Sequence, residues 1–223
     1  MARAVSPDLS AFYAAEHEKA GVKLKLRTGV EAIEGTDKVT GIVAGGKSYP
    51  TDLVLVGIGV IPCQELAEAA GLGCTDGIVV DQNAKTGDPH IWAAGDCTRH
   101  VGREGHEIRL ECVQNAIDQA KHAAYSMVGK PKTYSEVPWF WSDQYDLKLQ
   151  IAGLARPTDT LVRRGDPAAR KFAVFHLRDG AVAAVEAVNA APEYMIGKKL
   201  VAEGKKIAAE TLADTSIPMK QMA

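Results

Sequence analysis

The sequence predicts an α/β region followed by an α+β domain with an antiparallel sheet, and three observations support this division. The run from Leu53 to Ile58 is continuously aliphatic, which is typical of a parallel strand buried on both faces. Apolar residues recur at three- and four-residue steps from Cys112 to Val128, which indicates an amphipathic helix. Short apolar runs separated by turn signals follow from Trp139 to Val188, as expected for a sheet built of hairpins.

The α/β region opens with a helix that carries clear start signals. Ser6 suits the N-cap, Pro7 the first helical position, and Asp8 the positive end of the helix dipole. Gly21 ends this helix, whose inner face would carry Leu9, Phe12, Tyr13 and His17. The other elements expected in this region are a short helix at 65–70 and strands at 22–26, 39–44, 47–49, 53–58, 78–80 and 91–93.

The chain changes character after Gly129-Lys130-Pro131, which is the best domain boundary in the sequence. Beyond it we expect a turn at Arg178-Asp179-Gly180 and a helix from Pro192 to Glu203. The tail from Thr215 to Ala223 is expected to be extended and poorly ordered. Strands are expected at 139–141, 149–152, 161–163, 172–177 and 182–188.

Composition excludes several classes of protein. Hydrophobic residues make up 46% and charged residues 24%, which is ordinary for a soluble globular protein. No apolar run is long enough to span a membrane and the N-terminus has no apolar signal core, so a cytoplasmic protein is expected. Nothing indicates nucleic-acid binding. The histidines form no ligand pattern, and no C-x-x-C spacing occurs, so no metal site is expected; the cysteines are Cys63, Cys74, Cys97 and Cys112.

Charge is unevenly distributed along the chain. The net charge is −2, but residues 147–206 carry eleven Lys and Arg against six Asp and Glu. A basic domain of this kind can mark a docking face for an acidic partner. A solvated surface without a partner is the alternative explanation.

The most informative stretch runs from Thr86 to Asp96, where a short apolar strand is followed by a glycine and an acid. Ligands of α/β folds bind at the carboxyl ends of such strands. Gly95 permits close approach of the backbone, and the Asp96 carboxylate can accept a hydrogen bond from a ligand hydroxyl. A helix-capping role for Asp96 is the structural alternative.

A second candidate site is the glycine turn Gly57-Ile58-Gly59. A side chain at either glycine would keep the backbone away from a flat ligand ring. The turn is not a phosphate-binding fingerprint, because a third glycine is absent and Pro62 intervenes.

The start of the long helix is a third candidate. Its exposed N–H groups and positive dipole end would stabilise negative charge on a ligand. Glu111, Val113 and Asn115 are the residues that we expect at this contact, with Val113 acting through its backbone. A capped amphipathic core helix would use Glu111 in the same way.

Three consecutive aromatic residues begin the C-terminal sheet. Trp139, Phe140 and Trp141 are costly to expose, and the alternation of a strand places both indoles on one side. A plain sheet core is the alternative explanation.

These segments together resemble a known family. The run T-x-D-P-x-I-x-A-x-G-D, which ends at Asp96, resembles the second flavin-binding motif of the two-dinucleotide-domain flavoprotein reductases. The run W-F-W-S-D-Q-Y, which begins at Trp139, resembles the oxygenase-coupled ferredoxin reductases of the putidaredoxin reductase and rhodocoxin reductase type. No catalytic H-x-x-x-x-E pair of the glutathione-reductase branch follows.

The resemblance implies a role for each candidate residue. Asp96, beside Gly95, would hold the ribityl hydroxyls of FAD, and Trp141 would lie against the flavin. The helix start with Glu111, Val113 and Asn115 would point at the flavin pyrimidine ring. The turn Gly57-Ile58-Gly59 would lie beside the nicotinamide of NAD, although Cys63 stands where family members often carry a polar residue.

The same resemblance implies an incomplete two-dinucleotide-binding-domain fold of the glutathione-reductase-like kind, with a C-terminal α+β domain. Residues 1–62 would form the C-terminal portion of the NAD-binding domain. Residues 63–131 would form the returning portion of the FAD-binding domain, and residues 132–223 the antiparallel domain.

The function implied is a reductase that passes electrons from NADH through FAD to the [2Fe–2S] ferredoxin of an oxygenase system. Because the cofactor carries the chemistry, no catalytic acid or base is required. The lysines expected to dock the acidic ferredoxin are Lys121, Lys148, Lys198 and Lys199. A non-catalytic interaction module is the alternative from another functional class, and an enzyme of another flavin branch is a further one.

The main departure from the family is the absence of any G-x-G-x-x-G loop in this sequence. Family members carry two, both N-terminal to the region of resemblance, so much of the nucleotide-binding half is expected to be missing. The apolar surface that packs on that half would then be exposed, and self-association is expected.

A binding prediction follows from the missing loops. Without their N–H groups and helix dipoles, the cradles for the pyrophosphate of FAD are lost, so the isolated 223-residue chain should bind FAD weakly or not at all. Gel filtration after incubation with FAD measures this directly. A yellow protein that keeps stoichiometric flavin through the column would contradict the prediction.

Overall fold

The computed structural model describes residues 4–223, which form two compact units. One unit contains residues 11–60, and the other contains the N-terminal residues up to Ser10 together with Ile61–Ala223. The first helix, α1 (Pro7–Lys19), begins in the larger unit. Its start is as predicted, because the Ser6 Oγ accepts a hydrogen bond from the Leu9 N–H at 3.4 Å.

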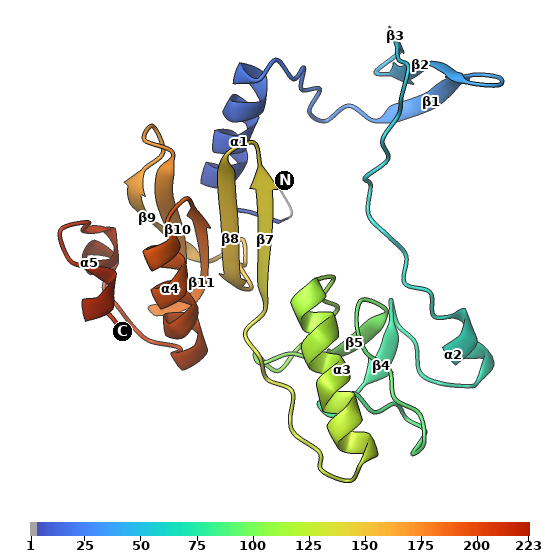
Figure 1. Ribbon diagram of the computed structural model, residues 1–223, viewed down its shortest axis with the longest axis vertical. Coiled ribbons are helices and arrows are strands. Elements are labelled where there is room, and N and C mark those ends of the chain that lie inside the picture. Colours follow the sequence, from blue (N-terminus) through green and yellow to red (C-terminus); the bar gives the residue numbers. More distant parts are fainter. Residues whose placement is uncertain (1–3) are drawn as a thin grey trace. The chain divides into compact units, whose positions relative to one another are not determined.

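The smaller unit contains a three-stranded antiparallel sheet in the order β1-β2-β3 (Figure 1). Its strands are β1 (Val30–Gly35), β2 (Val39–Ala44) and β3 (Lys47–Pro50). The predicted hairpin is confirmed, and Gly45 and Gly46 at its turn have φ values of 58° and 69° that favour glycine. β1 was not predicted, because its sequence mixes glutamate and glycine with apolar residues.

Two predicted strands of this unit are absent. Residues 22–26 and 53–58 form no strand, and Leu53 and Leu55 are 83% and 94% exposed. A central parallel strand is held by neighbours on both sides. None of the residues described pairs with either segment, so the aliphatic run 53–58 has no sheet to join.

Residues 61–131 of the larger unit carry α2 (Glu65–Ala69), β4 (Ile78–Val80), β5 (Thr98–Val101), β6 (Glu107–Ile108) and α3 (Val113–Met127). β4 pairs parallel with β5, and β5 pairs antiparallel with β6. The predictions of α2, β4 and α3 are confirmed. The strand predicted at 91–93 is wrong, since only an isolated bridge joins Trp92 to Lys85. β5 and β6 were missed.

The C-terminal sheet has five strands in the order β7-β8-β11-β10-β9, and every neighbouring pair is antiparallel (Figure 1). All five strands and the turn before β11 were predicted. Asp179 and Gly180 at this turn have φ values of 51° and 78°, which is the geometry of a tight hairpin turn. The strands are β7 (Trp139–Gln144), β8 (Leu147–Gly153), β9 (Thr160–Asp166), β10 (Lys171–Arg178) and β11 (Ala181–Val188).

One face of this sheet packs on α4 (Ala191–Glu203), which crosses β11 and β8, while α5 (Ala209–Ala213) packs on β9. The core between them is fully apolar; its most buried members include Ala152, Ala173, Phe175, Val185, Leu200 and Leu212. Gly197 of α4 is required there, because a Cβ would lie 2.8 Å from the Val185 Cγ1. The predicted helix at 192–203 is confirmed.

The C-terminal tail is ordered, so the prediction of an extended tail was wrong. It forms a 3₁₀ turn, η1 (Met219–Gln221), and Met219 and Met222 are both 4% exposed. The buried Arg164 guanidinium holds the segment by donating to the carbonyls of Leu212 at 3.2 Å and Ile217 at 2.8 Å. This contact joins residues far apart in sequence, so no local pattern could indicate it.

The other face of the sheet buries a polar pair from the neighbouring strands β10 and β11. Glu186 of β11 is fully buried and His176 of β10 is 2% exposed, with 3.5 Å between the carboxylate Oε1 and the imidazole Nε2. The same Oε1 accepts a hydrogen bond from the Ser6 N–H at 2.8 Å. The N-terminal segment of the larger unit is therefore fixed to the sheet by a carboxylate. Among residues 4–223, no helix has the length and apolarity that crossing a membrane requires.

A stability prediction follows from this pair. Glu186→Ala leaves the Ser6 N–H buried without its acceptor and removes the carboxylate that lies 3.5 Å from the His176 ring, so it should lower the free energy of unfolding by about 2–4 kcal/mol. Denaturant unfolding of the two proteins gives the difference. Glu203→Ala is the matched control, because Glu203 pairs with Lys199 on an exposed helix surface and should cost less than about 1 kcal/mol. Equal losses of unfolding free energy in the two variants would contradict a stabilising role for the buried Glu186 carboxylate.

Candidate functional site

The turn at Gly95 is held by buried polar contacts to α3. Gly95 has a φ of +90°, and its N–H donates to the Gln119 Oε1 at 2.8 Å. The Thr98 hydroxyl lies 2.8 Å from both the Gly95 carbonyl oxygen and the Gln119 Oε1. Thr98 is fully buried and Gln119 is 1% exposed. The backbone that presents Asp96 is therefore fixed by the helix behind it.

Asp96 itself faces solvent. It is exposed, and its carboxylate makes no hydrogen bond or ion pair with any of residues 4–223. The element that follows is β5, which begins at Thr98, so the alternative role of Asp96 as a helix cap is wrong. A rigid turn thus presents an unpartnered acceptor, which is what recognition of a ligand hydroxyl requires.

The start of α3 offers backbone donors. Cys112 is its N-cap, and the Cys112 Sγ accepts from the Asn115 N–H at 3.4 Å. The first residue, Val113, is 59% exposed, and the N–H groups at the start of a helix have no carbonyl partner within it. Glu111 is exposed and forms an ion pair with Arg109.

Asn115 is buried and engaged in hydrogen bonds within the protein. It is 3% exposed, its Nδ2 donates to the Leu110 carbonyl at 3.1 Å, and its Oδ1 accepts from the Tyr134 hydroxyl at 2.7 Å. Burial raises the pKa of Tyr134, so that hydroxyl stays protonated as the donor. Asn115 therefore orders the helix start, while the outward-facing groups are those of its neighbours.

The two indoles of β7 lie together as predicted from strand alternation. The ring centroids of Trp139 and Trp141 are 5.5 Å apart, with 35° between the ring planes. Trp141 and Phe140 are 43% and 45% exposed, so the segment is not a plain sheet core. The Lys198 Nζ of α4 lies 4.8 Å from the centroid of the Trp139 ring, within the range of a cation–π contact.

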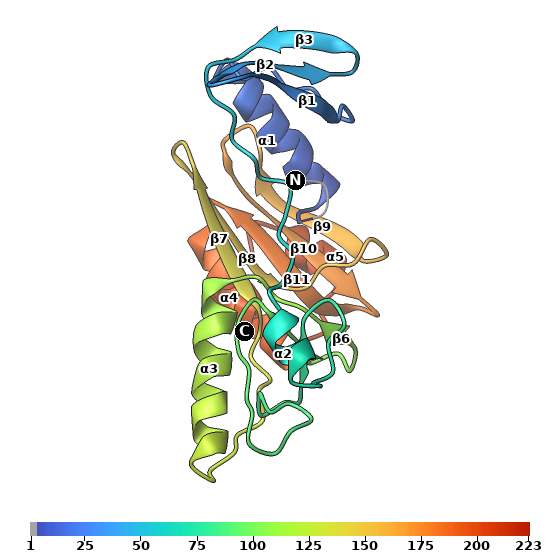
Figure 2. The same cartoon turned by 90° about the vertical axis from the view of Figure 1, so that its right-hand side faces the viewer.

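A cavity of about 580 Å³ joins the helix start to the sheet. Its lining includes Glu111 and Cys112 from the start of α3 and Trp139 and Phe140 from β7. Figures 1 and 2 both show the N-terminal end of α3 beside the first residues of β7. Asp96, Val113 and Trp141 are not part of this lining, which also takes in the His176–Glu186 pair.

The predicted nicotinamide turn lies in the other compact unit. Gly57, Ile58 and Gly59 form no regular element, and Ile58 is 84% exposed. Gly59 has a φ of +106°, a value that favours glycine, and a Cβ at either glycine would meet nothing within 4 Å.

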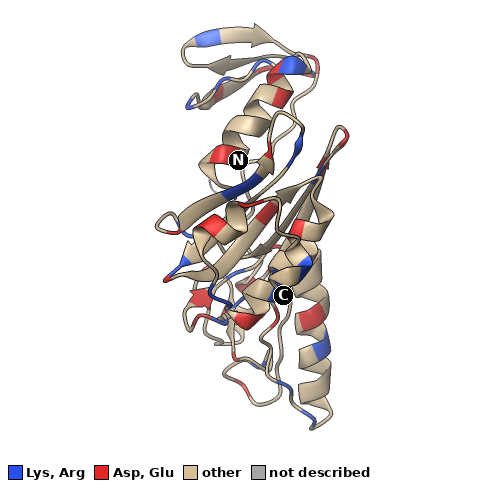
Figure 3. Ribbon diagram, turned by 90° about the vertical axis from the view of Figure 1, so that its left-hand side faces the viewer, with Lys and Arg blue, Asp and Glu red and all other residues tan. Residues whose placement is uncertain are grey.

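The predicted docking lysines differ in their surroundings. Lys121 pairs with Asp118 at 3.2 Å and Lys199 with Glu203 at 3.8 Å, whereas Lys148 is exposed at the start of β8. Much of the basic surplus of 147–206 is engaged within the protein, since Arg164 and Arg170 also form ion pairs. Basic and acidic residues are interspersed along the ribbon in Figure 3.

Gln119 and Tyr134 were missed, although they order the helix start and the Gly95 turn. Gln119 follows Asn115 by four residues, so both fall on the buried face of α3. Polar residues at this spacing on an otherwise apolar helix face are the signal that could have identified them. No group of three or more possible metal ligands occurs in the part of the chain that the structure describes.

Two family models match the chain. The pyridine nucleotide-disulphide oxidoreductase model matches residues 1–124, and the model of the reductase C-terminal region matches residues 139–223. Together they cover both sides of the boundary near Gly129.

The chain is similar to curated reductases over nearly its whole length. It is 45% identical to the 5,5'-dehydrodivanillate O-demethylase ferredoxin reductase subunit of Sphingobium sp., covering 100% of this chain and 55% of that protein. It is 40% identical to rhodocoxin reductase of Rhodococcus erythropolis, covering 99% of this chain and 52% of that protein. The chain thus spans about half the length of the curated relatives it matches.

A solved structure has the same fold. The covalent putidaredoxin reductase–putidaredoxin complex matches with a TM-score of 0.95 at 38% identity, covering 100% of this chain and 54% of that one.

A prediction about the Gly95 turn follows from its geometry. Gly95→Ala forces a side chain into the left-handed region, so it should lower the free energy of unfolding by about 1–2 kcal/mol. Gly87→Ala is the control, because Gly87 has open space around it and an ordinary φ, and should change stability by less than about 0.5 kcal/mol. Denaturant unfolding would disprove the strain argument if the two variants behaved alike.

Proposed function

This chain belongs to the pyridine nucleotide-disulphide oxidoreductase family, and on that premise we propose that its 223 residues supply the flavin-facing and partner-facing parts of an FAD-dependent NADH–ferredoxin reductase. The observation that carries the proposal is the unpartnered Asp96 carboxylate on a turn fixed by α3. In the proposed organisation, residues 1–62 belong to the NAD-binding domain, 63–131 to the FAD-binding domain and 132–223 to the domain that meets the partner.

The residues present suit the central part of FAD. Asp96 can accept hydrogen bonds from the ribityl hydroxyls, and the exposed Val113 at the start of α3 can offer its backbone N–H to the flavin. Gly95 gives the turn before Asp96 its φ of +90° and packs against α3, where a Cβ would lie 3.5 Å from the Ala116 Cβ. Trp141, half exposed on β7, offers a flat apolar surface to the flavin. The residues that would hold the pyrophosphate are not in this sequence, which lacks both glycine-rich loops.

When bound, FAD supplies the chemistry, because it accepts a hydride from NADH and releases electrons one at a time. In this proposal the residues of the chain bind FAD and NADH and orient them relative to each other. The dipole of α3 favours negative charge beside Val113, and Gly57 and Gly59 offer backbone without a Cβ atom to the flat nicotinamide ring of NAD. No residue is proposed as a catalytic acid or base.

A [2Fe–2S] ferredoxin is the proposed electron acceptor. Several relatives are named ferredoxin reductases, and one similar structure is a complex of putidaredoxin reductase with putidaredoxin. The proposed docking residues are Lys121, Lys148, Lys198 and Lys199. Lys198 links this set to the indoles through its contact with Trp139. NADH is an intracellular reductant, so the proposed activity belongs in the cytoplasm.

A functional prediction tests docking. Charge reversal of all four lysines to Glu, in a polypeptide that joins these residues to the glycine-rich loops, should raise the KM for ferredoxin several-fold at low salt, because attraction to the acidic partner is lost. NADH oxidation by a small dye should be unchanged. A control variant carries the same four charge reversals at exposed lysines of the smaller unit: Lys23, Lys25, Lys38 and Lys47.

Two outcomes would count against the proposal. Equal loss of the dye and ferredoxin activities would refute docking through these lysines. A protein with the glycine-rich loops restored that shows no flavin absorbance would refute the enzyme and favour a non-catalytic interaction module. Self-association, which is also proposed for the 223-residue chain, is read from its sedimentation at several concentrations.

A further inference from the structure

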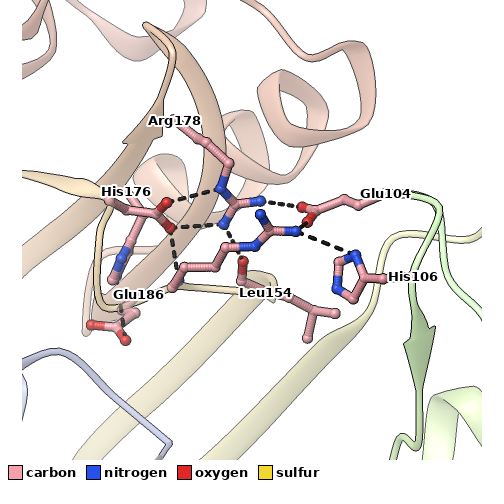
Figure 4. Close-up of polar contacts among 8 residues, drawn as sticks. Glu104, His106, Leu154, His176, Arg178 and Glu186 are labelled. Carbon is pink, nitrogen blue, oxygen red and sulfur yellow. Dashed lines mark hydrogen bonds and ion pairs between the residues drawn. The ribbon is translucent and has the colours of Figure 1, made fainter.

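The loop between β5 and β6 contacts the C-terminal domain through the carboxylate of Glu104. Figure 4 shows Glu104 of this loop facing the guanidinium groups of two arginines. The Arg156 Nη2 lies 2.5 Å from the Glu104 Oε2, and the Arg178 Nη1 donates to the other oxygen, Oε1. Each carboxylate oxygen therefore has its own arginine. Glu104, Arg156, Arg178 and Asp159 are called the arginine clamp below.

Arg178 is fixed within the C-terminal domain before it meets Glu104. Its Nε and Nη2 donate to the two carboxylate oxygens of Asp159, each at 2.9 Å, and Nη2 also donates to the Leu154 carbonyl at 3.0 Å. The Asp159 side chain is fully buried. Because the guanidinium is planar and two of its nitrogens are engaged, the Arg178 Nη1 is left to donate in one fixed direction. The clamp is therefore built to receive a carboxylate at one place.

The neighbours of Glu104 add two further contacts. The Arg103 Nη2 donates to the Ala202 carbonyl in the last turn of α4 at 2.7 Å, where a cation is favoured by the helix dipole. The His106 Nδ1 lies 3.3 Å from the Arg156 Nη2. Arg103, Glu104 and His106 of one short loop thus contact the β8–β9 connection, the end of β10 and the end of α4.

Apolar packing does not fix this contact. The C-terminal core contains only residues from Val137 onward, so it does not extend into residues 63–131. Instead a cavity of about 610 Å³ lies between the two parts, lined by Ile108 and Leu110 on one side and by Leu154, Val182 and Val201 on the other. Apolar contact is insensitive to direction, whereas charged hydrogen bonds are directional. Close to the linker, Tyr134 also donates to Asn115 at 2.7 Å. The clamp is the charged contact that can define an orientation away from the linker.

We propose that Glu104 is a positioning residue, which sets the orientation of the C-terminal domain relative to the part that carries Asp96 and α3. The proposal rests on the proposed function for its catalytic consequence: the clamp holds Trp139 and Trp141 in one relation to the flavin. Glu104 touches neither the proposed cofactor residues nor the docking lysines. Its loss should therefore slow electron delivery without weakening ferredoxin binding.

Partial exposure makes the clamp sensitive to salt. The side chains of Glu104, Arg156 and Arg178 are 32%, 43% and 20% exposed. Ion pairs of this exposure contribute little to global stability and are screened by added salt. Glu104 should accordingly control orientation far more than folding.

The first test needs no cofactor and uses the 223-residue chain. Hydrogen exchange of Glu104→Gln should be faster than in the parent protein at residues 102–106 and 154–159, and unchanged in the paired strands β10 and β11. Asp146→Asn is the matched control, because Asp146 pairs bidentately with Arg170 inside the C-terminal domain and its change removes the same charge. Unchanged exchange at 102–106 in Glu104→Gln would overturn the clamp.

The second test measures ferredoxin reduction in a flavin-loaded polypeptide that includes the glycine-rich loops. Glu104→Gln should lower kcat for ferredoxin several-fold while the KM for ferredoxin and the rate of dye reduction stay unchanged. Glu104→Asp, which keeps the charge on a shorter side chain, should restore part of kcat. Normal kcat in Glu104→Gln would overturn the positioning role. A parent protein that reduces dye but never ferredoxin would refute the proposed function. The hydrogen-exchange experiment does not depend on that function and would still show whether Glu104 orders residues 102–106 and 154–159.

Discussion

The C-terminal domain depends on the burial of both faces of the β10–β11 hairpin. One face carries apolar side chains that pack on α4 and α5, and this packing supplies the core. The other face buries Glu186 and His176, which are stable there because the carboxylate accepts the Ser6 N–H and lies beside the imidazole. A single hairpin thus organises both the helices and the attachment of the N-terminal segment. The strand that carries the indoles, β7, is attached to this hairpin through β8.

The exposed residues of the candidate site are held in place by buried polar side chains, and not by contacts among themselves. Gln119, Thr98 and Tyr134 are buried, and their hydrogen bonds fix the Gly95 turn and the start of α3. Asp96 and Val113, which follow the fixed turn and begin the helix, are exposed. The same arrangement recurs in the arginine clamp, where buried Asp159 fixes Arg178 and the partly exposed Glu104 completes the contact.

Sequence reasoning succeeded where local signals act alone. The five C-terminal strands, α3 and α4 follow from periodicity, turn residues and caps, and the pairing of Trp139 with Trp141 follows from strand alternation. It failed where structure depends on distant partners. The run from Leu53 to Ile58 has a strand composition but pairs with no strand among residues 4–223. The tail is held by Arg164, which lies about fifty residues upstream. The burial of Asn115 was missed for the same reason, since its partner Tyr134 lies beyond the helix.

The solvent-facing Asp96 has a consequence for the protein without its cofactor. An ionised carboxylate in water carries no desolvation cost, so the folded chain tolerates Asp96 with nothing bound to it. That cost arises only when a ligand closes over the turn, and the ligand's own hydroxyls then offset it. The groups that fold the chain are therefore distinct from the groups proposed to recognise a ligand. The proposed recognition surface is therefore already assembled before any ligand binds.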